Sequence, residues 1–412
     1  MVKAGYVNCR TFTAKGYDIV DNVYMQRAWA EVNLDAIAAN LHSIRAKLTN
    51  PSTKIMAVVK ADAYGHGFLQ VTKTLLENKA DALGVAVLDE AKQLRSRGID
   101  VPILILGKTN IEAAEDIIDF DVMPTVFSYE IAKALSDTAV KKRKDVRIHI
   151  KIDTGMTRLG YMYHGEADAA VIDEIERISR LPYLVIDGIF THLACADETD
   201  EAYTRLQFGR FTELCGKLKE CGVDVGTRHV CNSAGLVMYP EMQLDMVRPG
   251  IILYGLHPSE LTGRSIELTP AMSLKARVTM VKTVDSGVGI SYGKEYETHG
   301  KTVIATVPVG YADGYSRLLA GKAGMIAGEK LVPVVGRICM DQCMVDVTNV
   351  YNISEGDTVT IMGADGGQSI TADDLAGYMG TINYEVVCII GKRIPRVYVS
   401  GGNVVRALNS LV

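Results

Sequence analysis

The chain carries the stretch AVVKADAYGHG at residues 57–67, where an apolar run ends at a lysine and a glycine-bracketed turn follows. The apolar residues at 55–59 predict a short, fully buried strand. Lys60 then leaves this strand half desolvated, and desolvation favours the neutral, nucleophilic form of an amine. A neutral lysine forms imines with aldehydes, whereas the alternative is a lysine that ends a strand by reaching for solvent. The glycines and Tyr64 favour the first interpretation, because they supply a backbone that can turn tightly and a hydroxyl suited to a phosphate.

Strand and helix patterns alternate outward from this stretch, up to about residue 257. Apolar runs predict strands at 54–59, 82–87, 101–106, 122–126, 146–152, 185–190, 227–230 and 246–254. Helical patterns lie between them at 34–48, 89–97, 111–118, 129–137 and 204–220, and Asp35 is expected to cap the first. About eight such units favour a closed (β/α)8 barrel over an open doubly wound sheet, with the residues after each strand lining one face.

The pattern changes after about residue 268. Glycines and turn residues split a series of β-rich runs, and residues 371–379 give the best helix signal, capped by Thr371. This change predicts a second, mainly antiparallel β domain. We therefore expect an N-terminal extension at 1–28, a barrel at 29–265 and a β domain at 266–412.

The composition is that of an ordinary globular protein, with 48% hydrophobic and 23% charged residues. The net charge of -5 does not favour nucleic acid or a membrane surface as a partner, and no apolar run is long enough to span a bilayer. The first residues lack a charged-then-apolar signal pattern, so we expect a cytoplasmic location. The eight cysteines form no C-x-x-C pair, and Cys339 and Cys343 have no histidine nearby, so no metal site is expected.

Further motifs accompany the lysine stretch in a fixed order. They are KIDTGMTRLG (151–160), TH (191–192), HVCNSA (229–234), MVRPGI (246–251), SYG (291–293), GYADG (310–314), GRICMD (336–341) and NYE (383–385). With residues 57–67, this ordered set resembles the alanine racemase family over about residues 29–396. The resemblance implies a pyridoxal 5′-phosphate-dependent enzyme that interconverts L-alanine and D-alanine and supplies D-alanine for peptidoglycan. Thr157 departs from the glycine common in the family, and we expect a local loop adjustment there.

The resemblance implies a set of cofactor-binding residues from both domains: Lys60, Tyr64, His192, Asn232, Ser233, Arg248, Gly250, Ile251 and Tyr384. In this set Lys60 forms the imine link, and Arg248 hydrogen-bonds the pyridine nitrogen. Because an arginine stays protonated, that nitrogen would remain unprotonated and the ring would be a weaker electron sink, which suppresses transamination. A structural ion pair near the domain boundary is the alternative for Arg248.

Racemisation needs a base on each face of Cα, and the resemblance implies Lys60 for the D-enantiomer and Tyr292 for the L-enantiomer. A free tyrosine has a pKa of about 10, so Tyr292 needs help from its neighbours. By resemblance His192 approaches Tyr292 and is itself oriented by Arg248. Taken alone, His192 after its strand is more often a satisfied core histidine than a catalytic one.

The resemblance also implies substrate-binding and supporting residues. Arg158 and Met340 contact the substrate, and the supporting positions are Lys151, His229, Tyr311, Arg317 and Asp341. A family lysine at the position of Lys151 can be carbamylated, whereas the residue pattern alone also allows an outward-facing lysine. Because Tyr292 lies beyond the domain boundary, the resemblance implies a two-fold homodimer with composite active sites.

Three rival functions remain. The first is the same chemistry on serine, which Tyr384 disfavours weakly because its ring leaves little room for a polar substrate group. The second is a non-catalytic pyridoxal phosphate carrier, which would need no base such as Tyr292. The third is a barrel decarboxylase, whose expected cysteine nucleophile region is not found in this sequence.

Overall fold

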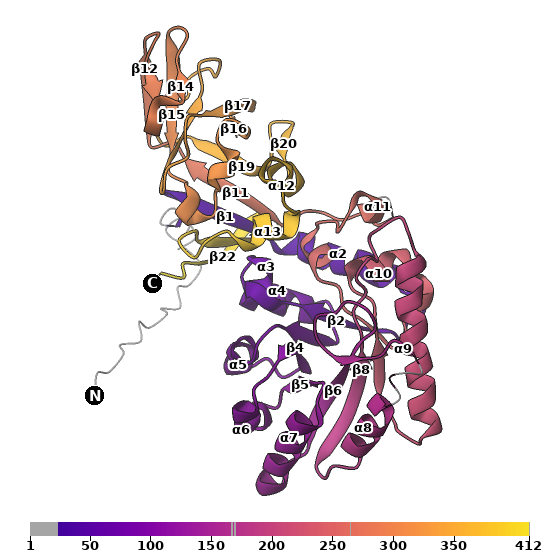
Figure 1. Ribbon diagram of the computed structural model, residues 1–412. Coiled ribbons are helices and arrows are strands. Elements are labelled where there is room, and N and C mark those ends of the chain that lie inside the picture. Colours follow the sequence, from indigo (N-terminus) through magenta and orange to yellow (C-terminus); the bar gives the residue numbers. More distant parts are fainter. Residues whose placement is uncertain (1–23, 166–167, 169, 264, 412) are drawn as a thin grey trace, which may run out of the picture. The chain divides into compact units, whose positions relative to one another are not determined.

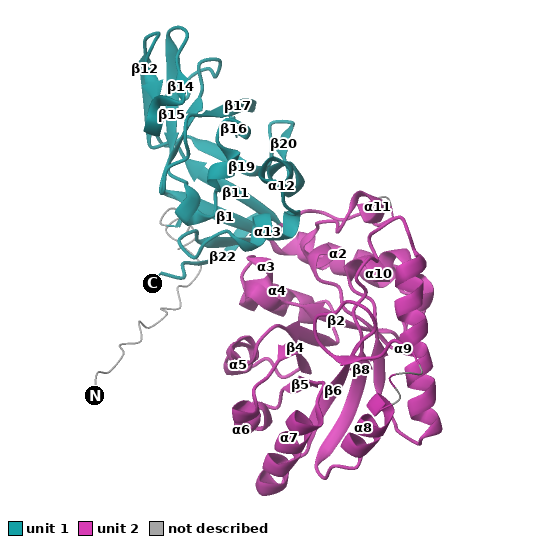
Figure 2. Ribbon diagram, viewed as in Figure 1, with its two compact units in different colours: residues 1–32, 272–412 teal, residues 33–271 magenta. Residues whose placement is uncertain are grey.

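The computed structural model describes residues 24–165, 168, 170–263 and 265–411, and it divides the chain into two compact units (Figure 2). One unit comprises residues 33–271, and the other combines residues 272–412 with the segment that precedes residue 33. Most of the expected extension at 1–28 lies outside the described residues.

The unit boundaries differ from the expected ones at both ends of the barrel. Strand β1 (Ala28–Asn33) pairs antiparallel with β11 (Met272–Arg277), so residues 29–32 belong to the second unit. At the other end, Asn40 exchanges side-chain hydrogen bonds with the backbone of Thr269, and Ala271 N–H donates to Tyr254 O at 3.0 Å. These bonds keep residues 266–271 with the barrel.

Eight parallel strands form the barrel, and a two-residue strand pairs with one of them at its edge. The eight are β2 (Lys54–Val58), β3 (Ala82–Val85), β4 (Ile103–Lys108), β5 (Met123–Val126), β6 (Val146–Asp153), β8 (Leu184–Phe190), β9 (Thr227–His229) and β10 (Met246–Val247), with β7 (Tyr161–Met162) on β6. Two backbone bonds join β9 and β10, from Asp245 N to Arg228 O and from Arg248 N to Cys231 O. The expected eight-stranded barrel is confirmed.

The helices cover the outside of the strands. Figure 1 shows α5, α6 and α7 on one side of them and α9 on the other. Their bounds are α2 (Leu34–Ala46), α3 (Lys60–Tyr64), α4 (Phe68–Glu77), α5 (Leu88–Ser96), α6 (Ala114–Asp119), α7 (Tyr129–Lys142), α8 (Ala170–Ser179), α9 (Ala202–Glu220), α10 (Ser233–Met238) and α11 (Glu260–Gly263). Short 3-10 turns are η1 (Ile111–Ala113), η3 (Pro240–Met242) and η4 (Ile251–Tyr254).

The side chains inside the barrel fall into an apolar layer and a polar group. The apolar layer takes one side chain from each of several strands: Met56, Ala82, Leu104, Met123, Phe190 and Met246. Buried polar side chains of β6, β9 and the residue after β10 fill another part of the interior: His149, Lys151, His229 and Arg248. The site described below is built on this polar part.

Two local expectations were wrong. Residues 246–254 form a two-residue strand and then η4, because the backbone turns at Gly250 (φ -120°, ψ -96°) and leaves the sheet. Helix α2 is capped by Asn33 and not by Asp35, since Asn33 Oδ1 accepts from Ala36 N–H at 3.1 Å. Asp35 lies instead in the first helical turn, where its charge suits the helix dipole.

The second unit is a β structure, as expected. Its sheet runs in the order β12-β15-β18-β17-β16-β19-β11-β1-β21-β22, with antiparallel pairs from β12 to β1 and between β21 and β22. The bounds are β12 (Met280–Val284), β13 (Gly289–Ile290), β14 (Tyr296–Glu297), β15 (Thr302–Val307), β16 (Gly324–Ala327), β17 (Lys330–Val335), β18 (Cys343–Asp346), β19 (Thr358–Asp365), β20 (Gln368–Ile370), β21 (Arg396–Ser400) and β22 (Asn403–Leu408). Helices α12 (Ala372–Met379) and α13 (Asn383–Cys388) follow β20, and Thr371 caps α12 as predicted.

Across the described ranges, no helix is both long and apolar enough to cross a membrane.

Candidate active site

Lys60 stands at the exit of β2 and opens an unusual turn. The next four residues, 61–64, all have φ between 52° and 55°, which is the left-handed region that favours glycine. Non-glycine residues pay about 1–2 kcal/mol each in this conformation. Backbone bonds hold the turn, among them Ala63 N to Val59 O and Gly65 N to Ala61 O, each 2.9 Å. The turn therefore presents Lys60 on a strained but hydrogen-bonded backbone.

Two hydroxyls meet the backbone of Gly250. Gly250 N–H donates to Ser233 Oγ at 2.9 Å, and a Cβ at Gly250 would lie 2.6 Å from Tyr64 Oη. Only glycine leaves this space open. Ile251 follows within η4 and is fully buried. Hydroxyls together with a closely approaching backbone are the donor set that a phosphate dianion needs, so these residues fit a phosphate group.

Asn232 caps a helix in this neighbourhood. Its Oδ1 accepts from Gly235 N–H at 2.9 Å and so caps α10. Its amide also lies 3.4 Å from Leu193 O. Asn232 thus fixes the start of the helix that carries Ser233.

Arg248 is the centre of a buried hydrogen-bond network. Its Nη2 donates to Thr191 O at 2.7 Å and to Val230 O at 3.0 Å. Nη1 lies 2.8 Å from His229 Nδ1, and Nη2 lies 3.3 Å from His192 Nδ1. A guanidinium can only donate, so both Nδ1 atoms must accept. Burial lowers the pKa of Arg248 to about 10, which leaves it a cation at neutral pH.

The network continues through the barrel to a residue that the sequence interpretation missed. His149 Nδ1 lies 2.8 Å from His229 Nε2, and His149 Nε2 lies 3.5 Å from Asp187 Oδ2. Since His229 accepts from Arg248, its proton sits on Nε2 and is donated to His149. Gly188 makes room, because a Cβ there would lie 2.5 Å from the His149 ring. The signal was the alternation His149, Lys151, Asp153 in one strand, which points all three side chains to one face.

The network predicts acid sensitivity. Burial lowers the pKa of His149, and burial with the Arg248 charge lowers the pKa values of His192 and His229 well below the usual range. At acidic pH the unfolded chain therefore binds protons on these histidines more tightly than the folded chain does. This stability is complete above the ordinary histidine pKa of about 6.5 and is lost as pH falls below it towards the folded pKa values. The urea concentration at the midpoint of unfolding should be lower at pH 5.5 than at pH 8. In His149→Gln the difference between the two midpoints should be smaller. Equal midpoints at both pH values would contradict the neutral network.

Lys151 is buried in the barrel and does not face outward. Its Nζ lies 4.7 Å from the centre of the Phe190 ring, and within the described chain it makes no hydrogen bond or ion pair. Burial, followed by the charges of Arg248 and Arg158, lowers the pKa of Lys151 well below its usual value. Burial and the two arginines therefore disfavour the charged form of Lys151.

The loop after β6 orients Arg158. The Asp153 carboxylate accepts from the backbone N–H groups of Gly155, Thr157 and Arg158 at 2.9–3.0 Å. Burial opposes ionisation of Asp153, but these backbone donors, Thr157 first, outweigh it and lower its pKa. Thr157 itself adopts φ 55°, so it takes the conformation that a glycine would take there. The departure from the family pattern is accommodated as strain at one residue.

Four cationic or potentially cationic groups thus influence one another at this end of the barrel. The charges of Arg248, Lys151, Arg158 and Lys60 all lower the pKa of His192, after burial. Arg158 also lowers the pKa of Arg248. Such a concentration of positive charge suits anionic groups, for example a phosphate and a carboxylate.

In the second unit, Tyr292 lies on an exposed loop between β13 and β14. Its side chain is 71% exposed. Ser291 Oγ donates to Arg337 O at 2.6 Å, and Arg337 pairs with Glu295 across the loop. A Cβ at Gly336 would lie 2.7 Å from Ile290 O, so the two segments pack backbone to backbone. The loop is anchored at its base while Tyr292 projects outward.

Tyr311 and Met340 belong to the same loop cluster. Tyr311 N–H donates to Cys339 O at 3.2 Å, and Ala312 N–H donates to Met340 O at 3.0 Å. A Cβ at Gly310 would lie 2.3 Å from Cys339 O, which makes this contact dependent on glycine. Tyr311 and Met340 are both about half exposed.

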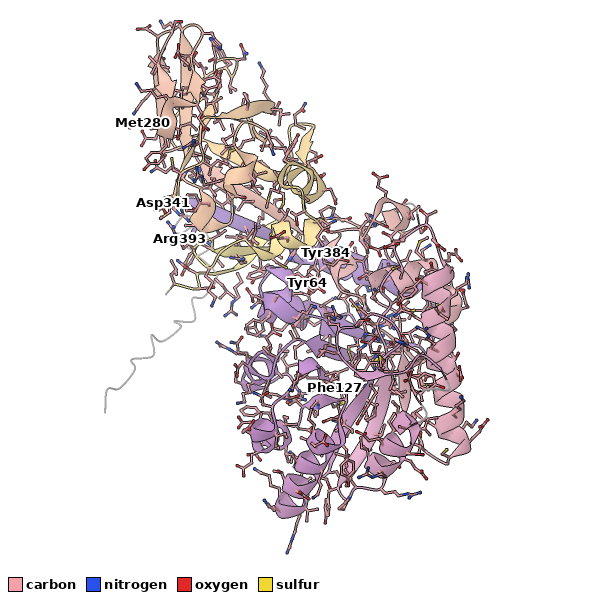
Figure 3. The ribbon with its side chains drawn as sticks, in the orientation of Figure 1. Tyr64, Phe127, Met280, Asp341, Tyr384 and Arg393 are labelled. Atoms are coloured by element: carbon pink, nitrogen blue, oxygen red, sulfur yellow. The ribbon has the colours of Figure 1, made fainter. Side chains whose placement is uncertain are left out.

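The remaining residues expected in the second unit surround this cluster or lie on α13. Asp341 Oδ1 accepts from Arg393 Nη1 at 2.7 Å, and Figure 3 shows the two side by side. Arg337, and more weakly Arg317, lower the pKa of Glu295, so Arg317 lies on the same surface. Tyr384 is half-buried on α13.

Known proteins resemble this chain over nearly its full length. Family models described as "Alanine racemase, N-terminal domain" and "Alanine racemase, C-terminal domain" match residues 32–258 and 271–398. An alanine racemase of Clostridium tetani is 48% identical over 388 residues, which cover 94% of this chain and 99% of the relative. The solved alanine racemase of Clostridium difficile 630 is 42% identical with a TM-score of 0.89, covering 94% and 99% of the two chains. A solved histidine racemase of Leuconostoc mesenteroides is 30% identical with a TM-score of 0.83, covering 91% and 98%.

Proposed function

The chain belongs to the alanine racemase family, and we propose that it interconverts L-alanine and D-alanine with pyridoxal 5′-phosphate as its cofactor. The observation that carries this proposal is the combination of Lys60, the hydroxyls and backbone that meet at Gly250, and the buried guanidinium of Arg248. D-alanine is a component of peptidoglycan, and supply of that component is the proposed role. The cytoplasmic location remains a prediction.

The residues that would hold the cofactor fit its chemical groups. The hydroxyls of Tyr64 and Ser233 and the backbone at Gly250 and Ile251 suit the phosphate. Lys60 would make the covalent link to the aldehyde. When bound, the cofactor supplies an electron-withdrawing ring that acidifies the Cα–H bond of an amino acid.

Arg248 would set the electronic character of that ring. Its guanidinium is held by four acceptors and keeps its charge. A permanent donor facing the ring nitrogen would donate a hydrogen bond to its lone pair, so that the nitrogen would stay unprotonated. The weaker electron sink disfavours reprotonation at positions other than Cα, which suits racemisation and not transamination.

Two bases would exchange the Cα proton. Lys60 would act on one face, on D-alanine, and Tyr292 on the other, on L-alanine. Arg158, oriented by the Asp153 loop, would hold the substrate carboxylate, with Met340 completing the pocket. His192 accepts from Arg248 through Nδ1, so its proton is on Nε2 and can be donated to a phenolate.

The proposed assembly is a two-fold homodimer with composite sites. Tyr292, Tyr311 and Met340 lie on an anchored loop cluster and are exposed within their own unit. Exposed aromatic and methionine side chains on a rigid cluster are typical of a surface that meets another one. We propose that this cluster completes the barrel site of the partner chain.

Lys151 is proposed to be carbamylated. A neutral buried amine adds to carbon dioxide, forming a C–N bond and losing a proton, and the product is an anion. That anion would satisfy the two arginines that disfavour a lysine cation. Protein equilibrated with 13C-bicarbonate should show one carbamate carbonyl signal by NMR that is absent in Lys151→Ala. Lys73→Ala, at a lysine of α4 with no hydrogen bond among the described contacts, is the control. A signal that persists in Lys151→Ala would contradict the assignment.

The substrate and the class of function are tested together by a racemisation assay. The cofactor-loaded protein is incubated with L- and D-forms of alanine, serine and histidine, and the enantiomers are separated by chiral chromatography. Alanine is expected to react fastest. Faster serine or histidine turnover would reassign the substrate, and histidine is included because one structural relative is a histidine racemase. Cofactor binding without turnover of any amino acid would favour the carrier function.

A further inference from the structure

The carboxylate of Glu90 accepts hydrogen bonds from the backbone at the ends of two strands, β2 and β3, beside Lys60. Glu90 is the third residue of α5, which follows β3. Its Oε1 accepts from Ala61 N–H at 2.7 Å, while Oε2 accepts from Ala86 N–H at 2.7 Å and lies 3.4 Å from Val87 N. Ala61 is the residue directly after Lys60, so the carboxylate reaches the peptide on which the lysine stands.

The Ala61 N–H needs an acceptor that the turn does not give it. The first N–H groups of a helical turn have no partner within it, and this rule holds for either handedness. Glu90 supplies a charged acceptor, which forms a stronger hydrogen bond than a neutral one. The four left-handed residues 61–64 are each unfavourable, so an external bond at their start bears directly on whether the turn forms.

The other end of the carboxylate is fixed to rigid structure. A Cβ on Gly107 would lie 2.4 Å from Ala86 O, so the end of β4 packs directly against the Ala86 peptide. Val59 N–H also donates to Gly84 O at 2.9 Å, which ties the exits of β2 and β3 together. Glu90 therefore connects the turn to a part of the barrel that has little freedom to move.

We propose that Glu90 is a positioning residue for Lys60: its carboxylate clamps the 60–61 peptide to the exit of β3 and so fixes the direction of the lysine side chain. Its effect on catalysis rests on the proposed function, in which Lys60 is the base for D-alanine. The clamp itself does not depend on that function.

The ordinary role of an acidic residue at this place is to complement the helix dipole. A comparison with Asp89 distinguishes this helix-dipole role from the clamp. Asp89 precedes Glu90 in the first turn of α5, is exposed, and makes no hydrogen bond among the described residues. Asp89→Asn and Glu90→Gln remove the same charge from the same turn. Only Glu90→Gln also replaces one of the two acceptor oxygens of the clamp with an NH2 group, which cannot accept, so the side chain can no longer hold both peptides.

The first experiment measures amide hydrogen exchange of residues 61–67 in the cofactor-free full chain. Loss of a charged hydrogen bond predicts roughly tenfold to 100-fold faster exchange in Glu90→Gln. Exchange in Asp89→Asn should match the unsubstituted chain. Unchanged exchange in Glu90→Gln, or equal acceleration in both variants, would overturn the clamp.

The second experiment asks whether the clamp matters for the lysine base. Initial rates are measured with D-alanine and L-alanine carrying deuterium or hydrogen at Cα, in holoenzyme. In Glu90→Gln the isotope effect should rise for D-alanine only. For both enantiomers kcat should be about tenfold lower and KM nearly unchanged, because the equilibrium constant fixes the ratio of the two kcat/KM values. An equal rise in the isotope effect for both enantiomers would overturn the positioning role even where exchange supports the clamp. Failure of the proposed function is seen separately, as absence of racemisation in the unsubstituted enzyme.

Discussion

Lys60→Ala should abolish the imine absorbance of the cofactor-loaded protein and reduce alanine racemisation by at least about 10⁴-fold. The reason is that one substitution removes both the covalent link to the cofactor and the base on one face of Cα. Both readouts come from one preparation, by absorbance spectroscopy and by chiral chromatography of the products.

A lysine on the same strand provides the matched control for this experiment. Lys54 begins β2, at the opposite end from Lys60, and is exposed. Lys54→Ala should keep both the absorbance and the rate. Racemisation near the unsubstituted rate in Lys60→Ala, with no amine added, would refute the assignment of Lys60.

Tyr292→Ala should remove nearly all activity in the pure variant, and mixing it with Lys60→Ala should restore activity. In a heterodimer with composite sites, one site carries both substitutions and the other carries neither. Exchange of subunits should therefore recover up to about half the activity per heterodimer, since one of two sites is intact. The measurement is racemisation after exchange, with heterodimer content checked by differently tagged chains.

Tyr351→Ala is the control for the loss of an exposed tyrosine from this unit. Tyr351 lies in the same unit, is 89% exposed and stands outside the loop cluster that carries Tyr292. Tyr351→Ala should be fully active alone. If exchanged mixtures of the two inactive variants gain no activity, both bases belong to one chain and the composite-site proposal fails.

Much of the barrel could be predicted because its signals are local. Each buried strand is a short apolar run and each helix a 3.6-residue pattern, so their alternation is visible in the sequence. The errors arose where partners distant in sequence decide the structure. Residues 29–32 were assigned to the barrel domain, but they form part of a strand that pairs with residues 272–276. Residues 246–254 look like one strand, but the backbone turns at Gly250.

The candidate site was predicted mainly by resemblance, and the structure adds what motifs cannot contain. The left-handed turn at 61–64 was invisible because none of its residues is a glycine. Glu90 contacts Ala61 across 29 positions, and His149 contacts His229 across 80, so neither partnership leaves a local pattern. The outward-facing alternative for Lys151 depended on which face of β6 points inward, and burial of Lys151 contradicts it.

The left-handed turn also bears on the order in which the chain folds. At about 1–2 kcal/mol for each of four residues, the turn opposes its own formation by an amount comparable to the net stability of a typical domain. An isolated segment makes too few contacts to offset this free-energy cost, so the flanking strands must already be paired before the turn is completed. The segment carrying Lys60 should thus be among the last parts of the barrel to become native, and a nascent chain would acquire a closed barrel before it acquires a competent lysine.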